Sequence, residues 1–419
     1  MQPGRRNGGR MQQDKALQIM LRGDNVMLTG PAGSGKSYLL SKFVNKARRQ
    51  RKKVVVTATT GLAAAHLGGQ TIHSWSGMGL DNKLHEDYTY MMSEGRKKLI
   101  RKTDVLIIDE VSMMHDYNLD MVDQAMKIVR ENEEPFGGMQ VILCGDFFQL
   151  PPVQQGGNGK FITESKAWQA LELSVCYLEE QHRADDLRLQ EILNAMRAGD
   201  MKQKHLKWLL ARKGIEPPEE VTRLYTINVD VETLNAQKLA EVPGDSHYLL
   251  RTSKGGFGSI QQLERNVLAP AVLELKQSAV VMAVKNDPEQ RFANGSTGVV
   301  IDFTDDGLPI VKFKGKRPII VYPDIWELKS GDKTTASITQ VPLRLAYAIT
   351  VHKSQGMTLD AAEIDLTKAF VEGMGYVGLS RVKNLDNLYL KGINQRALMV
   401  STEAQKIDAA LRLRSKELL

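Results

Sequence analysis

The sequence predicts an α/β protein built on parallel β-sheets, with a smaller antiparallel β segment in its second half. Three apolar runs, at residues 54–56, 105–108 and 141–144, have the continuous apolar character of strands that are buried on both faces. Each run ends in a polar turn, which is typical of the carboxyl edge of a parallel sheet. Between residues 299 and 345 the pattern changes to short apolar runs separated by turn signals, as in antiparallel hairpins, and the α/β pattern then returns.

A glycine-rich motif of the form G-x-x-x-x-G-K-S occupies residues 30–37. A short apolar strand at residues 26–28 precedes it, and a segment with helical spacing follows it. In this context backbone N–H groups turn inward and cradle a polyphosphate at the start of a helix. We expect Lys36 to reach the β- and γ-phosphates and Ser37 to ligate Mg2+. The residues expected to surround the phosphates are Gly33, Ser34, Gly35, Lys36 and Ser37.

Two acidic residues, Asp109 and Glu110, follow the buried run at residues 105–108. We expect Asp109 to hold the water shell of Mg2+ and Glu110 to polarise the attacking water. Gln149 lies in the loop after the next buried run, where it can contact the γ-phosphate or that water. A P-loop combined with these groups indicates hydrolysis of a nucleoside triphosphate, and not only its binding.

Hydroxyl groups, a histidine and an aromatic ring gather in two further turns, at residues 57–61 and 69–75. Hydroxyl and backbone N–H groups can hold phosphates, and Trp75 could stack on a base. Burial of Trp75 in the core is an equally good interpretation. The basic, tyrosine-containing segment at residues 76–103 reads as a small insertion, which acts either in strand separation or as a solvated surface loop.

Composition sets broader limits on the chain. Its 419 residues suggest two to four domains, and its net charge of +7 permits nucleic-acid binding without requiring it. Cys144 and Cys176 lack metal-site spacing, and we expect both to be buried thiols. Residues 1–10 are rich in arginine and glycine and are expected to form a disordered tail. We see no membrane span or secretion signal, so we expect a cytoplasmic protein, associated with the nucleoid if it is bacterial or from a phage.

In their order, these motifs resemble those of the superfamily 1 helicases, most closely the branch that contains the Pif and Dda helicases, with RecD as a more distant relative. The resemblance extends over about residues 11–390 and continues through the second half of the chain. The matching segments are residues 30–37, 59–61, 69–75, 109–113 and 145–151, and then residues 224–228, 294–298, 342–359 and 376–381.

The resemblance implies two RecA-like P-loop domains with parallel sheets, plus a small SH3-like β-barrel insertion in the second. The expected boundaries are residues 11–180 for the first domain with its wedge-like insertion at 76–103, residues 181–298 and 342–419 for the second, and residues 299–341 for the SH3-like insertion. ATP and Mg2+ would bind between the domains. The second domain would supply Gln355, Gly356 and Arg381 to that site.

Two residues near the predicted site keep alternative interpretations. Arg183 is a candidate arginine finger, although an isolated arginine of this kind is by default a surface ion-pair partner. Gln13, upstream of the P-loop, could read adenine with its amide or be an exposed helix residue.

The resemblance also implies an ATP-dependent DNA helicase that translocates 5′ to 3′ on single-stranded DNA and unwinds tailed or forked duplexes. A monomer would suffice, because one chain carries a complete ATP site. The implied DNA contacts are Thr60, Thr71, His73, Ser74, Thr350, His352, Ser354 and Thr358. Two other classes remain: a P-loop ATPase that remodels protein without unwinding, and a nucleic-acid-binding module with vestigial hydrolysis. The presence of Glu110, Gln149 and both arginines argues against the second.

Overall fold

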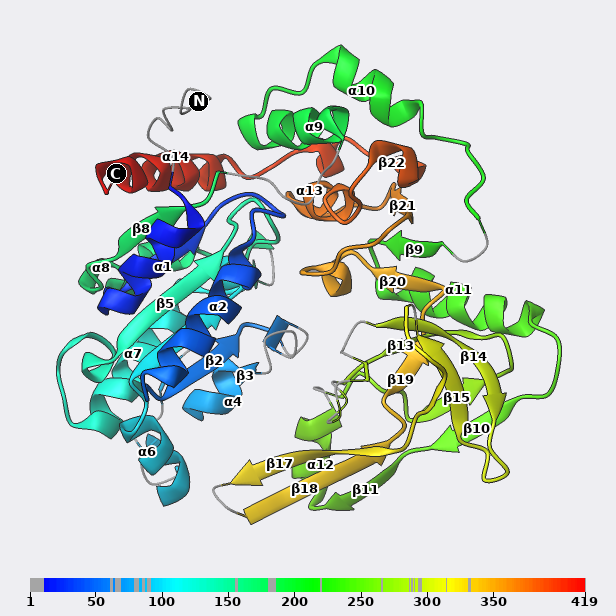
Figure 1. The fold of residues 1–419 in the computed structure, drawn as a ribbon, viewed down its shortest axis with the longest axis horizontal. Helices are drawn as coiled ribbons and strands as arrows, with labels where there is room; N and C mark the ends of the chain where they lie inside the picture. Colours follow the sequence, from blue (N-terminus) through cyan, green and yellow to red (C-terminus); the bar gives the residue numbers. More distant parts are fainter. Residues whose placement is uncertain are drawn as a thin grey trace, which may run out of the picture.

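The computed structural model describes residues 11–60, 63–64, 69–78, 83–84, 87–88, 92–154, 157–179, 186–218, 221–264, 267–285, 287, 289, 291–292, 296–313, 315–330 and 333–418. These residues form two α/β units that lie side by side (Figure 1). Helices α9 (Leu187–Ala198), α13 (Met374–Leu379) and α14 (Thr402–Glu417) lie together at one end of the pair. One hydrophobic core contains Leu143 of the first unit, Ile192 of α9 and Ile364 of the second unit. The two units are therefore joined at this end by a shared core.

The first unit is a parallel sheet with the strand order β3-β2-β4-β5-β1-β8. Its strands are β1 (Val26–Thr29), β2 (Val54–Ala58), β3 (Gln70–Thr71), β4 (Val105–Asp109), β5 (Gln140–Gly145) and β8 (Ser174–Tyr177). Its helices are α1 (Gln13–Arg22), α2 (Lys36–Arg49), α4 (Ile72–Ser76), α6 (Glu94–Arg101), α7 (Asp116–Arg130) and α8 (Lys166–Ala170). The short strands β6 (Val153–Gln154) and β7 (Gly157–Asn158) form a separate hairpin.

Both faces of this sheet are covered, as the continuous apolar runs predicted. In β1, Val26 and Leu28 pack with Phe43 of α2 on one face, whereas Met27 packs with Val122 of α7 on the other. Because side chains alternate along a strand, only a strand buried on both sides needs an unbroken apolar sequence. The predicted parallel α/β class is therefore confirmed.

The second unit contains a parallel sheet with the strand order β20-β9-β21-β22. Its strands are β9 (Thr222–Tyr225), β20 (Ala348–Thr350), β21 (Ala362–Leu366) and β22 (Leu388–Ile393). Helix α11 (Asn228–Glu241) packs on β20, and α13 packs on β21. Helix α10 (Gln203–Leu210) packs on α9.

Antiparallel sheets occupy the stretch from residue 247 to residue 345. They comprise β10 (His247–Leu250) with β12 (Val272–Leu275), then β11 (Thr252–Gly255), β18 (Lys333–Gln340) and β17 (Asp324–Ser330), and finally β16 (Ile319–Ile320), β15 (Pro309–Phe313), β14 (Thr297–Phe303), β13 (Val280–Ala283) and β19 (Leu343–Leu345). Helix α12 (Phe257–Glu264) packs on β18. This region is wider than the predicted insertion at residues 299–341, because short apolar runs such as β12 and β13 do not reveal their partner strand.

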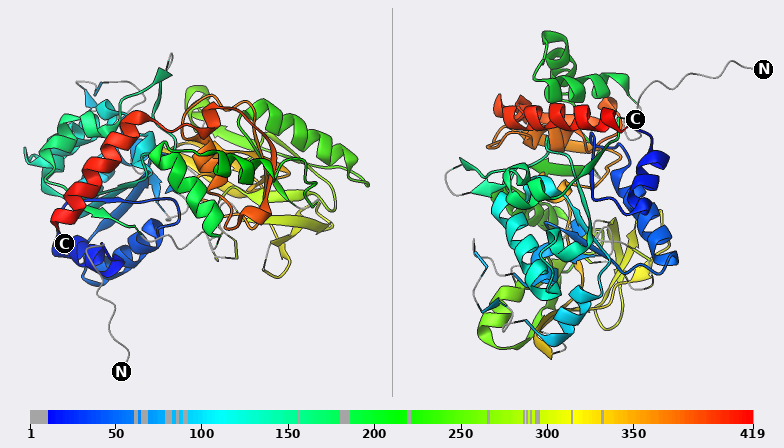
Figure 2. Two further views of the ribbon diagram at one scale, coloured as in Figure 1. Left: turned by 90° about the horizontal axis from the view of Figure 1, so that it is seen from above. Right: turned by 90° about the vertical axis from the view of Figure 1, so that its left-hand side faces the viewer.

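The last helix, α14, packs on the first unit, although its residues were predicted to continue the second domain. Figure 2 shows it lying along the first unit after the chain has left β22. The backbone N–H of Tyr177 in β8 donates to the Ser415 hydroxyl of α14 over 3.1 Å. Leu418 joins the core cluster under α1 and α2.

The predicted insertion at residues 76–103 is only partly described by the structure. Residues 79–82, 85–86 and 89–91 of the predicted insertion lie outside the described residues, and α6, at its end, packs on α7. None of the described helices combines the length and the apolar character needed to cross a bilayer.

Candidate active site

The P-loop joins β1 to α2, in the strand–loop–helix arrangement that the motif predicted. The ammonium group of Lys36 donates to the carbonyl oxygens of Gly30 (2.8 Å) and Pro31 (3.2 Å), so it lies across the loop. Gly30 has φ of +144°, and a Cβ there would lie 2.3 Å from the carbonyl oxygen of Leu178. Glycine is therefore required where the loop passes the end of β8.

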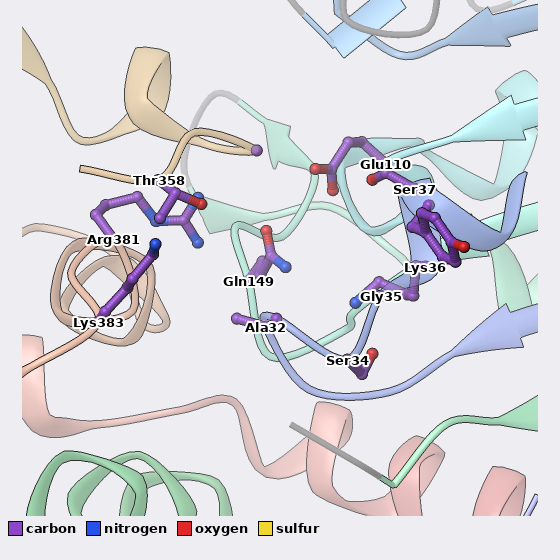
Figure 3. A pocket seen from close by; sticks show the side chains of 13 residues that line it. Ala32, Ser34, Gly35, Lys36, Ser37, Glu110, Gln149, Thr358, Arg381 and Lys383 are labelled. Atoms are coloured by element: carbon purple, nitrogen blue, oxygen red, sulfur yellow. The ribbon is translucent and has the colours of Figure 1, made fainter. Parts of the chain in front are cut away.

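A cleft of about 350 Å³ opens between this loop and the second unit. Its lining residues are Ala32, Gly33, Ser34, Gly35, Lys36, Ser37, Tyr38, Glu110 and Gln149 from the first unit, and Gly356, Thr358, Arg381 and Lys383 from the second. Figure 3 shows the second-unit side chains of Thr358, Arg381 and Lys383 on one side of the cleft, and Lys36 and Glu110 on the other. The structure thus brings Lys36, Glu110, Gln149 and Arg381, four of the predicted catalytic residues, into one site.

Glu110 follows the buried end of β4 and has φ of +54°, a left-handed conformation that non-glycine residues seldom adopt. Asp109 supports this turn by accepting the Glu110 N–H over 2.9 Å. Burial and the neighbouring Asp109 charge raise the pKa of Glu110 to about 7, although Lys36, Gln355 and Arg381 act in the opposite direction. A carboxylate with a pKa near neutrality suits a group that accepts a proton from the attacking water.

Several polar atoms at the cleft lack a protein partner. Within the described residues, the side-chain oxygens of Ser34, Gln149 and Gln355 are buried and make no hydrogen bond. The Gln355 amide nitrogen donates to Glu110 across the two units over 3.0 Å. Buried polar atoms are nearly always paired, so these oxygens indicate a polar ligand. The Ser34 hydroxyl can donate to a phosphate oxygen, and the two amide oxygens can accept from water. This donor and acceptor set fits a nucleotide such as ATP, and Ser37 and Asp109 are the residues that would hold its Mg2+.

Arg381 and Lys383 are the cations that the second unit places in the cleft, and only 1% of Arg381 is exposed. Its guanidinium donates to the carbonyl oxygens of Val377 (2.8 Å), Ser354 (3.1 Å) and Met357 (3.2 Å). These bonds fix the side chain before any substrate arrives. Arg183, the other candidate finger, lies outside the described residues, so its role stays a prediction.

Gln13 lies beside the P-loop, and its reading of adenine stays a prediction. Its amide nitrogen donates to the carbonyl oxygen of Ser34 over 3.4 Å, and the residue does not line the cleft. Tyr38 does line the cleft and is 65% exposed. Sequence reasoning missed Tyr38 because an aromatic residue at the start of a helix is usually read as packing.

Residues 12–214 match a family model described as PIF1-like helicase. The ATP-dependent DNA helicase Pif1 of Psychrobacter sp. (strain PRwf-1) is 38% identical, over 95% of this chain and 70% of the relative. The Pif1 helicase of Bdellovibrio bacteriovorus is 34% identical, over 93% of this chain and 89% of the relative. The chain belongs to the PIF1-like helicase family. It spans 63% of the length of the human PIF1 relative, at 34% identity.

Solved structures give the same result for the fold of this PIF1-like helicase. The Pif1 helicase from Candida albicans has a TM-score of 0.87 at 32% identity, over 98% of this chain and 100% of that one. A Bacteroides sp. Pif1 in complex with ADP-AlF4 has a TM-score of 0.78 at 29% identity, over 96% and 97% of the two chains. The same Bacteroides protein bound to single-stranded DNA has a TM-score of 0.75 at 29% identity, over 97% of each chain.

Predicted DNA contacts lie at the carboxyl ends of strands in both units of the PIF1-like chain. Thr60 lies just after β2, and its hydroxyl accepts the N–H of Ala63 over 3.2 Å. Thr71 ends β3, and its hydroxyl accepts the N–H of Ser74 over 3.2 Å. Ser74 is exposed at the same place. His73 is half-buried, and burial lowers its pKa. It is therefore a neutral hydrogen-bonding group near pH 7.

The second unit presents a similar edge. Thr350 ends β20, and its hydroxyl accepts the N–H of Lys353 over 3.3 Å. His352 stacks on Phe370 with ring centroids 6.0 Å apart, and burial lowers its pKa as well. Both residues stand at the carboxyl edge where ligands of parallel sheets bind.

Three assigned DNA contacts are placed elsewhere. Trp75 is 1% exposed and belongs to the main core, so its ring has no face free for a base. Ser354 is fully buried, and its hydroxyl donates to the carbonyl oxygen of Val351 over 2.7 Å. Thr358 lines the nucleotide cleft. Of the two interpretations of Trp75, base stacking and core packing, the structure therefore supports core packing. The Ser354 hydroxyl is occupied by a hydrogen bond within the turn after β20.

A buried network, which sequence reasoning did not anticipate, joins the P-loop to the second unit. Arg197 of α9 donates to both carboxylate oxygens of Asp146, over 2.8 and 2.9 Å. The Tyr376 hydroxyl of α13 accepts from Arg197 (2.9 Å) and from the P-loop N–H of Ala32 (3.1 Å), and it donates to Asp146 over 3.0 Å. Helix α13 ends just before Arg381, so one hydroxyl ties the helix that leads into this arginine to the phosphate-binding loop.

The same arginine makes a second set of contacts toward α14. Its other terminal nitrogen donates to the Tyr177 hydroxyl (2.8 Å) and to Asp408 (2.9 Å). The Tyr177 hydroxyl in turn donates to Asp408 over 2.7 Å. Arg197 follows Met196 directly and is buried on α9. A charged residue beside the apolar face of a helix was the sequence signal that could have revealed it.

The Tyr376→Phe variant tests this link. We expect its kcat for ATP hydrolysis to fall about tenfold with KM little changed, because the ring still packs while the P-loop and α13 lose their shared hydroxyl. The matched control is Tyr177→Phe, which removes a hydroxyl from the same arginine on the α14 side and should leave kcat within about twofold. Steady-state kinetics and melting temperatures of both variants check this. Equal kcat values for the two would show that the Tyr376 hydroxyl serves stability alone.

Proposed function

We propose that this chain is an ATP-dependent DNA helicase that moves 5′ to 3′ along single-stranded DNA and unwinds duplex DNA. The observation that carries the proposal is the cleft in which Lys36 and Glu110 of one unit face Arg381 of the other. Such a cleft is complete only when the two units approach each other. Hydrolysis and relative movement of the units are thereby linked.

The chemistry assigned to each residue follows from its position. Lys36 and the P-loop N–H groups hold the phosphates, and Arg381 stabilises the charge that develops on the transferred phosphoryl group. Glu110 and Gln149 orient the attacking water, and Glu110 accepts its proton. Mg2+ at Ser37 and Asp109 supplies charge neutralisation of the phosphate oxygens when bound.

ATP binding favours the closed arrangement, since the phosphates attract Arg381 toward the P-loop, and loss of phosphate permits opening. DNA held at the carboxyl edges of both sheets is then gripped by two surfaces whose separation changes once per cycle. Alternating grip gives stepping along one strand. The 5′-to-3′ direction rests on the family, because residue chemistry alone does not set it.

DNA is the partner class that the family supports. One solved relative is described as bound to single-stranded DNA, and another as unwinding forked double-stranded DNA through two coordinating Pif1 helicases. We propose single-stranded and tailed or forked duplex DNA as the partners of this chain. One complete cleft per chain makes a monomer sufficient for hydrolysis, and pairs of molecules at a fork are compatible with it.

ATP hydrolysis measured with and without single-stranded DNA tests the function. We expect strong stimulation by DNA, because the DNA-binding edges lie on both units and favour their closure. A protein-remodelling ATPase would hydrolyse ATP at the same rate with and without DNA. That outcome would remove the helicase proposal.

The Glu110→Gln variant tests the assigned base. The amide keeps the size of the side chain and cannot accept the proton, so we expect hydrolysis to fall at least about 100-fold. Binding of ATP, measured with a fluorescent analogue, should persist. Normal turnover in this variant would exclude Glu110 as the group that activates water.

A further inference from the structure

A second cavity, of about 550 Å³, lies in the second unit away from the nucleotide cleft. It is bounded by α11, the segment before β12, β12 itself and β19; Figure 1 shows α11 beside β20, near β13 and β19. Leu239, Val267 and Leu273 give it buried apolar walls. The volume falls within the range of about 300–1,000 Å³ that is usual for small-ligand sites.

The charged residues that line this cavity are Arg251, Arg344, Lys353, Glu232 and Glu274. Arg251 is neutralised by an ion pair with Glu264. Glu274 accepts hydrogen bonds from the hydroxyls of Ser246 (2.7 Å) and Tyr248 (3.3 Å). Arg344 and Lys353 therefore remain as the cations that face the cavity without a direct counter-ion among the described residues.

Both cations line the cavity, and their burial there has an energetic cost. Burial lowers the pKa of Arg344, and its Nε atom is buried with no hydrogen-bond partner in the described part of the chain. Burial and the charge of Arg344 lower the pKa of Lys353. The charge of Glu232 acts to raise the pKa of both Arg344 and Lys353. Within the described contacts, however, Glu232 forms no ion pair with Arg344 or with Lys353. An anion between the two cations would relieve both penalties.

The position of Lys353 indicates which anion. It lies in the 3-10 turn η4 (His352–Ser354) directly after β20, and its N–H is bonded to the hydroxyl of Thr350. His352, which is half-buried, is a predicted DNA contact at the edge of this unit, whereas Thr350 is buried. The cavity thus begins where the proposed DNA path passes, and its apolar walls suit the base and sugar that accompany a phosphate.

We propose that this cavity binds one nucleotide of the single-stranded DNA, with Arg344 and Lys353 at its phosphodiester group. This inference rests on the proposed DNA-binding function and adds a second contact region beyond the edges of the two parallel sheets. It places part of the DNA contact on β19, which carries Arg344, and on η4, which carries Lys353, at the boundary between the parallel and antiparallel sheets.

The test measures binding of a labelled oligothymidylate by fluorescence anisotropy over a series of salt concentrations. Each phosphate contact contributes about 0.7 to the slope of log affinity against log salt for single strands. Arg344→Met and Lys353→Met should each lower this slope by about 0.7 and weaken binding about tenfold. Because both side chains hold the same phosphate, the double variant should lose little more than either single variant.

Arg251→Met is the matched control, since Arg251 lines the same cavity but is paired with Glu264; its slope should equal that of the wild type. The melting temperature of Arg344→Met should be unchanged or higher, because the variant removes a partly buried charge. Wild-type slopes and affinities in both Arg344→Met and Lys353→Met would overturn the inference while leaving the helicase proposal intact. Failure of the wild type itself to bind the strand would instead overturn the proposed function.

A calorimetric titration with thymidine monophosphate separates a DNA nucleotide from a free one. We expect weak or undetectable binding of the monophosphate. Tight binding that Arg344→Met abolishes, with an unchanged DNA slope, would assign the cavity to a free nucleotide and overturn the DNA assignment.

Discussion

Arg381→Ala is expected to lower the rate of ATP hydrolysis about 10³-fold or more, with ADP affinity little changed. An arginine finger acts on charge that exists in the transition state, so its loss appears in turnover and not in binding of the product. The fixed position of the guanidinium, bonded to three backbone carbonyls, means that no rearrangement is needed when the units close. Single-turnover hydrolysis and ADP titration of the variant check both parts.

Arg381→Ala removes one donor from each of these three carbonyls, although Val377 still accepts from the Ser380 hydroxyl and Ser354 from the Met357 N–H, so a modestly lower melting temperature is also expected. Arg381→Lys restores a positive charge without the planar fork and should recover only part of the rate. Arg396→Ala, an exposed arginine of the same unit, is the control and should hydrolyse ATP normally. A loss of only a few-fold in folded Arg381→Ala would reduce Arg381 to a structural residue.

Lys36→Ala is expected to lower ATP hydrolysis to background while single-stranded DNA binding stays within about twofold. Among the described residues the ammonium group donates to P-loop carbonyls, and Lys36 lines the cleft, so its removal should leave the DNA-binding edges unchanged. Hydrolysis assays and fluorescence anisotropy on one protein preparation check the two halves of this result.

Lys42→Ala is the matched control for Lys36→Ala. Lys42 lies on the same helix, α2, but its ammonium group pairs with Asp14 on the surface over 2.9 Å, so its loss should leave hydrolysis unchanged. Retained hydrolysis in Lys36→Ala would remove the P-loop from the reaction. Equal loss of hydrolysis and of DNA binding would contradict the separation of the two sites.

Much of the nucleotide site could be predicted from sequence because its groups sit on backbone motifs with fixed local geometry. A glycine-rich loop between strand and helix places Lys36, and an acidic pair at a strand end places Glu110, whatever the rest of the chain does. The pairing of Arg381 with that site came from the resemblance, since no local pattern states which distant helix faces the loop.

The incorrect predictions concern groups whose role depends on tertiary packing. Trp75 and Ser354 lie in motifs with suitable chemistry, yet the fold buries one in the core and uses the hydroxyl of the other within its own turn. Arg197 was missed since its partners, Asp146 and Tyr376, lie 51 and 179 residues away in the chain. Long-range contacts of this kind leave little periodic signal.

The extent of the antiparallel region shows the same limit. Apolar runs at β12 and β13 fit a parallel or an antiparallel sheet equally well, because strand pattern reports burial and not the identity of the partner. Helix α14 is a similar case. Its amphipathic sequence predicts that one face is buried, but it does not specify that the face packs on β8 of the first unit.

The central claim, that closure of the two units on ATP drives movement along one DNA strand, is tested most directly by unwinding of duplexes with either a 5′ or a 3′ single-stranded tail. We predict ATP-dependent strand separation from the 5′ tail, little from the 3′ tail and none by Lys36→Ala. Absence of unwinding from both tails, in a protein whose ATP hydrolysis is stimulated by the same DNA, would contradict the account.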